Sequence, residues 1–299
     1  MIIGAGKSGT TTLYEWLKQH PQVFMSPVKE TNFFALEGQD VVPSGNDPKQ
    51  LRHYPWSITD RDEYEALFEG ASSEKAIGEV SPMYLYSQRA PQVIKEEIPA
   101  VKLIAILRHP VDRLHSRYMH LVRESREPAK DYSQVFNRNS IWWERDDLVR
   151  EGLYMQNLER YYHLFPAKQL RVYLYDDLKN NPELLLKDIF AFLEVDPDFS
   201  VDTELTFNPS GKIKNRWLDV VIGQNSALKS ALGLVSPQLL NRLKNNQTVL
   251  KQLMKWRSSN LERIPMPKEL RRDLIERIYG PEIFSLQKIL GRDLSHWLN

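Results

Sequence analysis

The first thirteen residues, MIIGAGKSGTTTL, constrain the fold of this chain more than any other stretch. Three apolar residues, Met1 to Ile3, predict a short buried strand, and Thr10 to His20 predicts a helix with an apolar stripe. Between them lies a loop that carries three glycines and Lys7. Glycines let a backbone approach an anion closely, and the free N–H groups at a helix start point toward it. The stretch therefore predicts a loop that binds a phosphate-like group.

This loop departs from the nucleotide-triphosphatase motif, which needs a glycine, four residues and then Gly-Lys-Ser/Thr. Gly6, Lys7 and Ser8 supply the end of that motif, but Met1 stands at the position of its first glycine. Gly9 and three threonines follow the lysine, so the lysine sits early in the loop. The anion that binds here is therefore not required to be ATP.

The composition is that of an ordinary soluble globular protein. Of its 299 residues, 41% are hydrophobic and 26% are charged. A net charge of +1 produces no overall field that would attract nucleic acid. The absence of cysteine removes disulfides, thiolate metal sites and cysteine nucleophiles. No apolar run approaches the ~20 residues of a transmembrane segment, and the start lacks a signal-peptide layout. We therefore expect a cytoplasmic protein.

Strands and helices alternate along most of the chain. The clearest strand is Val101–Leu107, a nearly unbroken apolar run of the kind buried on both faces of a parallel sheet. Further strands are expected near Val23-Phe24, at Ala76–Val80 and at Leu170–Tyr175. Helices are expected at Arg61–Phe68, Tyr154–Phe165 and Leu184–Leu193, and around a break at Tyr279-Gly280-Pro281. We predict an α/β, P-loop-like fold with a central, mainly parallel sheet flanked by helices, and a single domain over residues 1–299.

Basic and polar residues follow Val101–Leu107, where a parallel strand meets the next helix. Open α/β sheets bind ligands at this carboxyl edge. Arg108 offers a planar fork for a phosphate, and Ser116, two turns into the helix, offers a hydroxyl. A triphosphatase would instead need an aspartate here to hold Mg²⁺. The arginine favours a metal-free nucleotide with an extra phosphate, and the histidine spacing fits no metal site, so we predict none.

These motifs together resemble the sulfotransferases that use 3′-phosphoadenosine 5′-phosphosulfate (PAPS), closest in style to the heparan-sulfate-type and bacterial enzymes. Lys7–Thr11 looks like that family's 5′-phosphosulfate loop. Arg108–Tyr118 matches its 3′-phosphate signature, Arg-x-Pro-x-x-Arg-x-x-Ser-x-Tyr. Lys29–Phe34, KETNFF, resembles the Glu-x-x-Phe-Phe segment of the branch that sulfates carbohydrates. Ser210–Arg216 resembles the late basic loop that closes over the nucleotide, and the GRDL stretch with Trp297 resembles a common family ending.

The resemblance implies an enzyme that moves the sulfuryl group of PAPS to a hydroxyl, with an amine as the second choice. Glu30 would be the general base, and Lys7 would stabilise the charge that grows on the leaving group. The residues implied to bind PAPS are Lys7, Ser8, Gly9, Thr10, Thr11, Arg108, Ser116, Lys212 and Arg216. The acceptor would be a carbohydrate, a lipid, a small metabolite or a carrier-bound acyl chain.

Several assignments stay open at this point. His53 is a rival base, because sulfotransferases of phenols and steroids use a histidine. Arg113 could equally be a structural residue that pairs with an acidic neighbour such as Asp112. Trp142 and Trp143, with Tyr84 and Tyr86, line an acceptor cleft in one interpretation and are ordinary core in the other.

Two other activities compete with this interpretation. A P-loop nucleotide kinase would need the intact motif and an aspartate for Mg²⁺, which the sequence lacks. A catalytically silent PAPS-binding module would carry the same residues, because Lys7 and Glu30 indicate capacity and not turnover. The basic stretch 242–257 is a solvated surface or a docking surface for an anionic partner.

Overall fold

The computed structural model describes residues 1–40, 56–123, 131–203 and 264–298, with short pieces at 212–213, 252 and 261–262. The chain divides into two compact units. The first comprises Met1–Arg117, Pro128–Thr203 and Met266–Asn299, and the second comprises Tyr118–Glu127 and Glu204–Pro265. In the second unit, β6 (Lys212–Ile213) pairs antiparallel with β7 (Leu261–Glu262). The single-domain assignment stays a prediction.

The first unit is built on parallel strands. β1 (Ile2–Gly4), β4 (Leu103–Leu107) and β5 (Leu170–Leu174) form one sheet in the order β1-β4-β5. β2 (Val23–Met25) and β3 (Ala76–Gly78) form a second parallel pair. A parallel bridge between Ile2 and Val80 joins the two, which gives the order β2-β3-β1-β4-β5. The chain thus leaves central β1 toward one edge and later returns past it, and open α/β sheets bind ligands at such a switch point.

Strand β4 lies between β1 and β5. Each of its five residues is buried, as the apolar run predicts for a strand covered on both faces. Its register with β5 pairs Leu107 with Leu174, so the two strands end side by side. The residues that follow, Arg108 and Tyr175, consequently emerge at the same edge of the sheet. This edge also receives the loop after β1.

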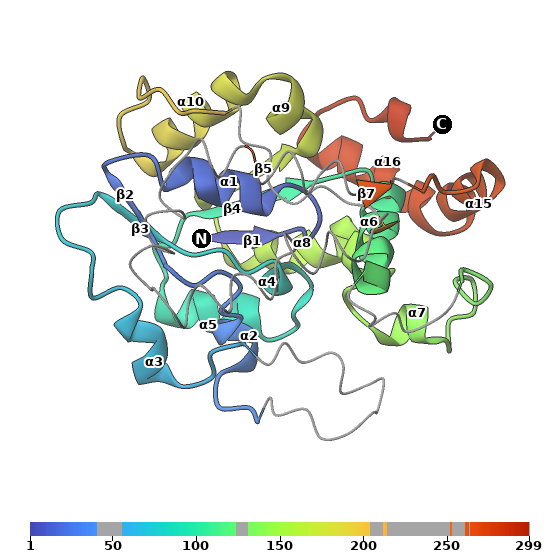
Figure 1. Ribbon diagram of the computed structural model, residues 1–299, viewed down its shortest axis with the longest axis horizontal. Helices are drawn as coiled ribbons and strands as arrows, with labels where there is room; N and C mark the ends of the chain where they lie inside the picture. The colour runs from blue at the N-terminus through green and yellow to red at the C-terminus, as the bar shows by residue number, and fades with distance from the viewer. Residues whose placement is uncertain are drawn as a thin grey trace. The chain divides into compact units, whose positions relative to one another are not determined.

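Helices cover both faces of the sheet (Figure 1). On one face lie α1 (Thr10–Leu17), α9 (Tyr175–Asn180) and α10 (Pro182–Leu193). Leu13, Trp16 and Leu17 of α1 are buried in the main core cluster, as their helical spacing predicts. On the other face lie α4 (Met83–Tyr86), α5 (Ala90–Glu97) and α8 (Tyr154–Leu164). The loop after β1 is thereby held between two packed layers.

Shorter elements complete the first unit: α2 (Phe33–Leu36), α3 (Arg61–Ala66), α7 (Ile141–Glu144), η2 (Arg150–Gly152) and η3 (Ala167–Gln169). Helix α6 (Pro110–Arg123) follows β4. Trp142 of α7 is wholly buried and the Nε1 of Trp143 donates to the carbonyl of Val135. Both tryptophans are therefore packed as core residues, which favours that interpretation over an acceptor cleft.

The expected break at Tyr279-Gly280-Pro281 coincides with the boundary between two helical elements. The chain stays helical through α15 (Lys268–Leu274), the π-helical turn η4 (Ile275–Tyr279) and α16 (Gly280–Leu290), and ends in the 3₁₀ turn η5 (Ser295–Leu298). Pro281 stands in the first turn of α16, where its missing N–H has no helical partner to lose. Within the described ranges, no helix is long and apolar enough to cross a membrane.

Candidate functional site

The loop after β1 is shaped by its last glycine. Gly9 precedes α1 with a φ of 95°, in the left-handed region that favours glycine. A Cβ at this position would lie 3.1 Å from Leu178 and 3.2 Å from Tyr175, so the backbone packs directly against α9. The loop is thus pressed onto the carboxyl edge of the sheet, and α1 begins at Thr10 with its N-terminal end toward the loop.

Ser8 carries the clearest sign of an anion at this loop. Its side chain is buried, and its Oγ has no hydrogen-bond partner among the described residues. Buried hydroxyl groups are normally paired, because an unpaired polar atom loses its bond to water. An anionic oxygen bound by the loop would accept a hydrogen bond from the Ser8 hydroxyl. Together with the ammonium of Lys7, this donor set fits the phosphosulfate end of PAPS.

Arg108 contacts the loop directly. Its Nη1 donates to the carbonyl oxygen of Lys7 at 3.2 Å, across 101 residues of sequence. The guanidinium lies 5.0 Å from the centroid of the Tyr175 ring, a cation–π distance. The hydroxyl of Tyr154 donates to the Arg108 carbonyl at 2.7 Å. The structure therefore brings the two cationic residues predicted for the two ends of the nucleotide to one place.

The remaining signature residues lie on α6. Ser116 is buried there, two turns after the helix begins. Arg113 is wholly buried, and its Nη1 donates to Glu151 Oε2 at 2.7 Å. The structural interpretation of Arg113 is thus correct, although its partner is Glu151 and not Asp112. Asp112 pairs with Arg271.

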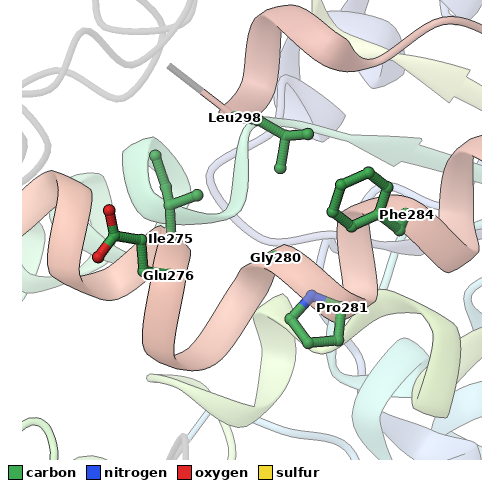
Figure 2. Close-up of a pocket in the computed structure, with 6 residues that line it drawn as sticks. All are labelled: Ile275, Glu276, Gly280, Pro281, Phe284 and Leu298. Carbon is green, nitrogen blue, oxygen red and sulfur yellow. The ribbon is translucent and has the colours of Figure 1, made fainter.

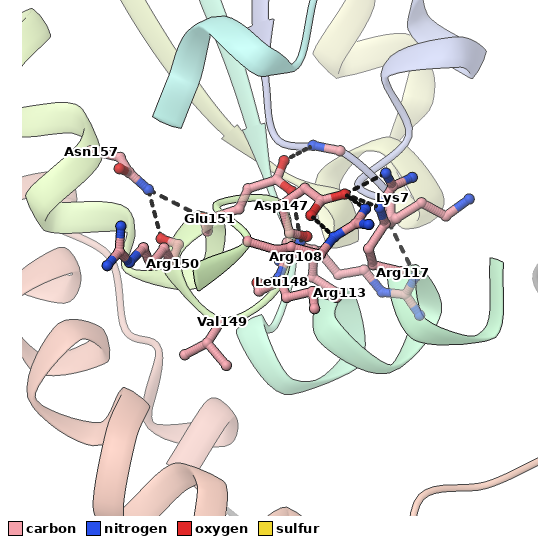
Figure 3. A network of polar contacts seen from close by, with 12 residues as sticks. Lys7, Arg108, Arg113, Arg117, Asp147, Leu148, Val149, Arg150, Glu151 and Asn157 are labelled. Atoms are coloured by element: carbon pink, nitrogen blue, oxygen red, sulfur yellow. Dashed lines mark hydrogen bonds and ion pairs between the residues drawn. The ribbon is translucent and has the colours of Figure 1, made fainter. Parts of the chain in front are cut away.

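Buried charges tie α6 to residues 145–151 (Figure 3). Arg117 Nε donates to Asp147 Oδ2 at 2.9 Å, and Arg145 Nε donates to Asp147 Oδ1 at 3.0 Å. Burial alone would raise the pKa of Asp147, but these two guanidinium groups hold it below its usual range. Arg113 also donates hydrogen bonds to the backbone carbonyls of Asp147 and Leu148. The start of α6 is therefore fixed against this segment by ion pairs as well as by packing.

Glu151 is a site residue that sequence reasoning missed. Its Oε1 accepts the backbone N–H of Gly6 at 2.6 Å, from 145 residues away. Burial raises the pKa of Glu151 to about 7, against the opposing effect of Arg113. No motif surrounds Glu151 in the sequence, so only the tertiary structure places it beneath the loop.

Glu30 lies on the segment between β2 and α2. Its side chain is 38% exposed, so its carboxylate is accessible from solvent. Its backbone has a φ of 58°, which is uncommon for a residue with a Cβ, and its N–H donates to the carbonyl of Val80 at 2.7 Å. Strained backbone of this kind is concentrated at functional sites. The neighbouring Phe33 and Phe34 are buried, as expected for the anchor of this segment.

Lys29, a second residue not singled out from the sequence, joins Glu30 to the loop helix. Its Nζ donates to the hydroxyl of Thr11 at 2.5 Å and lies 4.0 Å from Glu30 Oε1. It also lies 5.7 Å from the centroid of the Tyr14 ring. Burial lowers the pKa of Lys29, while Glu30 opposes that change. The ammonium therefore connects the expected base with the first turn of α1.

Other predicted residues lie outside these contacts. Lys212 is described only as part of the backbone of β6. Arg216, His53 and most of the basic stretch 242–257 lie outside the described residues. Within the described part of the chain, no group of three His, Asp or Glu side chains has the arrangement of a metal site. The assignments of Lys212 and Arg216 stay predictions.

A shallow hollow of about 510 Å³ lies elsewhere, on the C-terminal helices (Figure 2). Ile275, Gly280, Pro281, Phe284 and Leu298 line it, together with Glu276. This lining is apolar apart from one carboxylate and includes no predicted site residue. It offers no cation to an anionic nucleotide, so we place the candidate site at the loop.

The sequence profile of the sulfotransferase family matches residues 1–199, that is, 199 of the 299 residues. This span contains the loop, Glu30 and the whole of Arg108–Tyr118. The chain belongs to the sulfotransferase family. The resemblance read from the motifs is confirmed.

Named relatives add detail to this membership. The bifunctional heparan sulfate N-deacetylase/N-sulfotransferase 4 of Mus musculus is 26% identical over 239 residues, which cover 75% of this chain and 25% of that protein. The heparan sulfate glucosamine 3-O-sulfotransferase 5 of Mus musculus is 25% identical over 245 residues, which cover 80% of this chain and 64% of that protein. The chain thus spans less than two thirds of the length of these relatives.

A solved structure supports the fold. The crystal structure of a sulfotransferase from Alicyclobacillus acidocaldarius superimposes with a TM-score of 0.69 and 26% identity. The match covers 100% of this chain and 97% of that one. The predicted α/β, P-loop-like fold with a central parallel sheet flanked by helices is therefore confirmed.

Proposed function

We propose that this protein transfers the sulfuryl group of PAPS to an acceptor, with a hydroxyl as the expected acceptor and an amine as the second choice. The observation that carries the proposal is the contact between Arg108 and the carbonyl of Lys7. It puts a planar phosphate-binding cation beside an anion-binding loop, without an aspartate at the end of β4. PAPS carries two anionic groups, and these two features supply one site for each.

Each residue has a distinct task in the proposed reaction. The loop residues Ser8, Gly9, Thr10 and Thr11 hold the phosphosulfate end, while Arg108 and Ser116 hold the 3′-phosphate. The S–O bond to the phosphate breaks as the acceptor oxygen bonds to sulfur, and the acceptor proton passes to Glu30. The ammonium of Lys7 stabilises the negative charge that grows on the bridging oxygen. Adenosine 3′,5′-bisphosphate leaves with that charge.

The exposure of Glu30 and the names of the relatives support one acceptor class over the others. Glu30 is partly exposed and the neighbouring Phe33 and Phe34 are buried, which supports access of a large acceptor to the Glu30 carboxylate. The relatives are named as enzymes of heparan sulfate that act at nitrogen and at oxygen. We therefore favour a carbohydrate, and keep a lipid, a small metabolite and a carrier-bound acyl chain as alternatives.

Calorimetry and mass spectrometry test this proposal. We expect adenosine 3′,5′-bisphosphate to bind more tightly than ATP–Mg²⁺, because Arg108 and Ser116 bind the extra phosphate. With PAPS and a panel of acceptors, mass spectrometry should detect a product that gains one sulfuryl group. Lys7→Ala should reduce its formation by at least about 10²-fold, as for the loss of other transition-state donors. Lys18→Ala, which removes an exposed lysine of the same N-terminal region, is the control.

The results separate the competing activities. Tighter binding of ATP–Mg²⁺ would support a nucleotide kinase and contradict the proposal. Binding of adenosine 3′,5′-bisphosphate without transfer to any acceptor would instead support a silent binding module.

A further inference from the structure

The backbone of Lys7 is held in an uncommon conformation. Its φ is 65°, in the left-handed region, where a residue with a Cβ pays a penalty of about 1 kcal/mol or more. Such a residue keeps this conformation only when its surroundings determine it. The contacts on the two sides of Lys7 therefore decide where its ammonium points.

The backbone at Lys7 is held by two hydrogen bonds, one on each side of the residue. On the N-terminal side, the N–H of Gly6 donates to Glu151 Oε1 at 2.6 Å. On the C-terminal side, the carbonyl of Lys7 accepts from Arg108 Nη1 at 3.2 Å. Gly6 has no Cβ, and a Cβ there would lie only 2.9 Å from Glu151 Oε1, so the close approach requires glycine. The N–H of Gly6 is consequently committed to Glu151 and unavailable to a bound anion.

A carboxylate beneath an anion-binding loop would by itself repel the ligand. Arg113 cancels that charge, because its Nη1 donates to Glu151 Oε2 at 2.7 Å and both side chains are buried. Stability alone does not account for this pair, since apolar residues of similar volume often stabilise a core as well as a buried ion pair does. The hydrogen bond to Gly6 is what an apolar pair could not supply (Figure 3).

We infer that Glu151 is a positioning residue, which fixes the Gly6–Lys7 backbone so that the loop binds the nucleotide. Arg113 neutralises the charge of the Glu151 carboxylate. This inference rests on the proposed function. Glu151 touches no reacting atom, so its effect is transmitted through the backbone of the loop. The property that matters is a hydrogen-bond acceptor at Oε1 and not a negative charge.

Two double variants separate these properties. Arg113→Met with Glu151→Gln removes both charges and keeps an amide oxygen for Gly6. Arg113→Met with Glu151→Met removes the charges and the acceptor. In both variants the carbonyls of Asp147 and Leu148 lose their hydrogen bonds from Arg113. This loss is therefore the same in the two proteins. We expect the Gln variant to bind adenosine 3′,5′-bisphosphate within about threefold of the wild type, and the Met variant about tenfold more weakly than the Gln variant.

Each result has one meaning. Equal affinities of the two double variants would overturn the inference and leave the proposed function intact. Absence of binding by the wild type would overturn both. Should the Met variant fail to fold, Gly6→Ala provides the same test, because its Cβ would displace the Glu151 carboxylate. An unchanged affinity in Gly6→Ala would likewise overturn the inference.

Discussion

At the scale of single residues, Lys29 is a partly buried cation whose contacts indicate a function. An ammonium that is partly removed from water needs compensating contacts, and burial lowers the pKa of Lys29 accordingly. The compensation comes from the Thr11 hydroxyl, the Glu30 carboxylate and the Tyr14 ring. In the proposed reaction this cation lies next to both the loop helix and the base. It is thus placed to stabilise negative charge during transfer.

Lys29→Met therefore should reduce kcat by about 10²-fold, the loss typical for a donor that acts in the transition state. The affinity for adenosine 3′,5′-bisphosphate should change much less, because Lys7, Arg108 and Ser116 remain. Steady-state kinetics with PAPS and calorimetry together measure this difference.

A matched control exists on the same aromatic ring. Lys18 Nζ lies 5.2 Å from the centroid of the Tyr14 ring, but Lys18 is exposed. Lys18→Met removes an ammonium of the same kind without touching Thr11 or Glu30. An equal loss of kcat in both variants would show that the Lys29 contacts have no special role.

At the scale of elements, the segment between β2 and α2 is anchored by one buried carboxylate. The carboxylate of Glu79, just after β3, accepts hydrogen bonds from the hydroxyl groups of Thr31 at 2.9 Å, Ser81 at 2.7 Å and Tyr84 at 2.6 Å. Burial raises the pKa of Glu79, and these hydrogen bonds oppose the rise. Since Thr31 adjoins Glu30, the network sets where the expected base lies.

Thr31→Val tests this anchor. Valine keeps the shape of threonine but removes the hydroxyl, so Glu79 loses one donor and the Glu30 segment loses one tie. We expect kcat to fall about tenfold, with the free energy of unfolding reduced by about 1 kcal/mol. Tyr64→Phe removes a longer contact to Glu79, 3.3 Å, from a different element. If Tyr64→Phe lowered kcat as much as Thr31→Val, the effect would belong to Glu79 in general and not to the Glu30 segment.

At the scale of the whole molecule, stability should depend on pH through His109. His109 is buried before α6, and its Nδ1 accepts the N–H of Val111 at 3.2 Å. Burial, together with the charge of Arg271, lowers the pKa of His109 to about 4, from an ordinary value of 6.5. The unfolded chain therefore binds a proton between pH 6.5 and 4 that the folded chain rejects, so stability falls as the pH falls through this window.

His109→Asn removes this titration and keeps an acceptor for the helix start, because asparagine is a good N-terminal cap. Urea unfolding at pH 7 and at pH 4.5 should show that the wild type loses about 2 kcal/mol more than the variant. Comparison of the two proteins cancels the titration of other groups. Equal losses in both would mean that His109 is protonated in the folded protein.

The local features of this protein were predictable from its residues alone. The apolar run before Arg108, the glycine loop before α1 and the stripe of Leu13, Trp16 and Leu17 each follow from short-range spacing, and each element is in place. Such patterns show in the sequence because the side-chain period of a strand or a helix repeats within a few residues.

The way in which these elements meet could not be predicted from the sequence. The contact of Arg108 with Lys7 spans 101 residues and that of Glu151 with Gly6 spans 145, and no periodicity encodes such pairs. The glycine loop was thus evident in the sequence, but the contacts of Glu151 and Arg108 with its backbone became visible only when the sheet brought distant segments together.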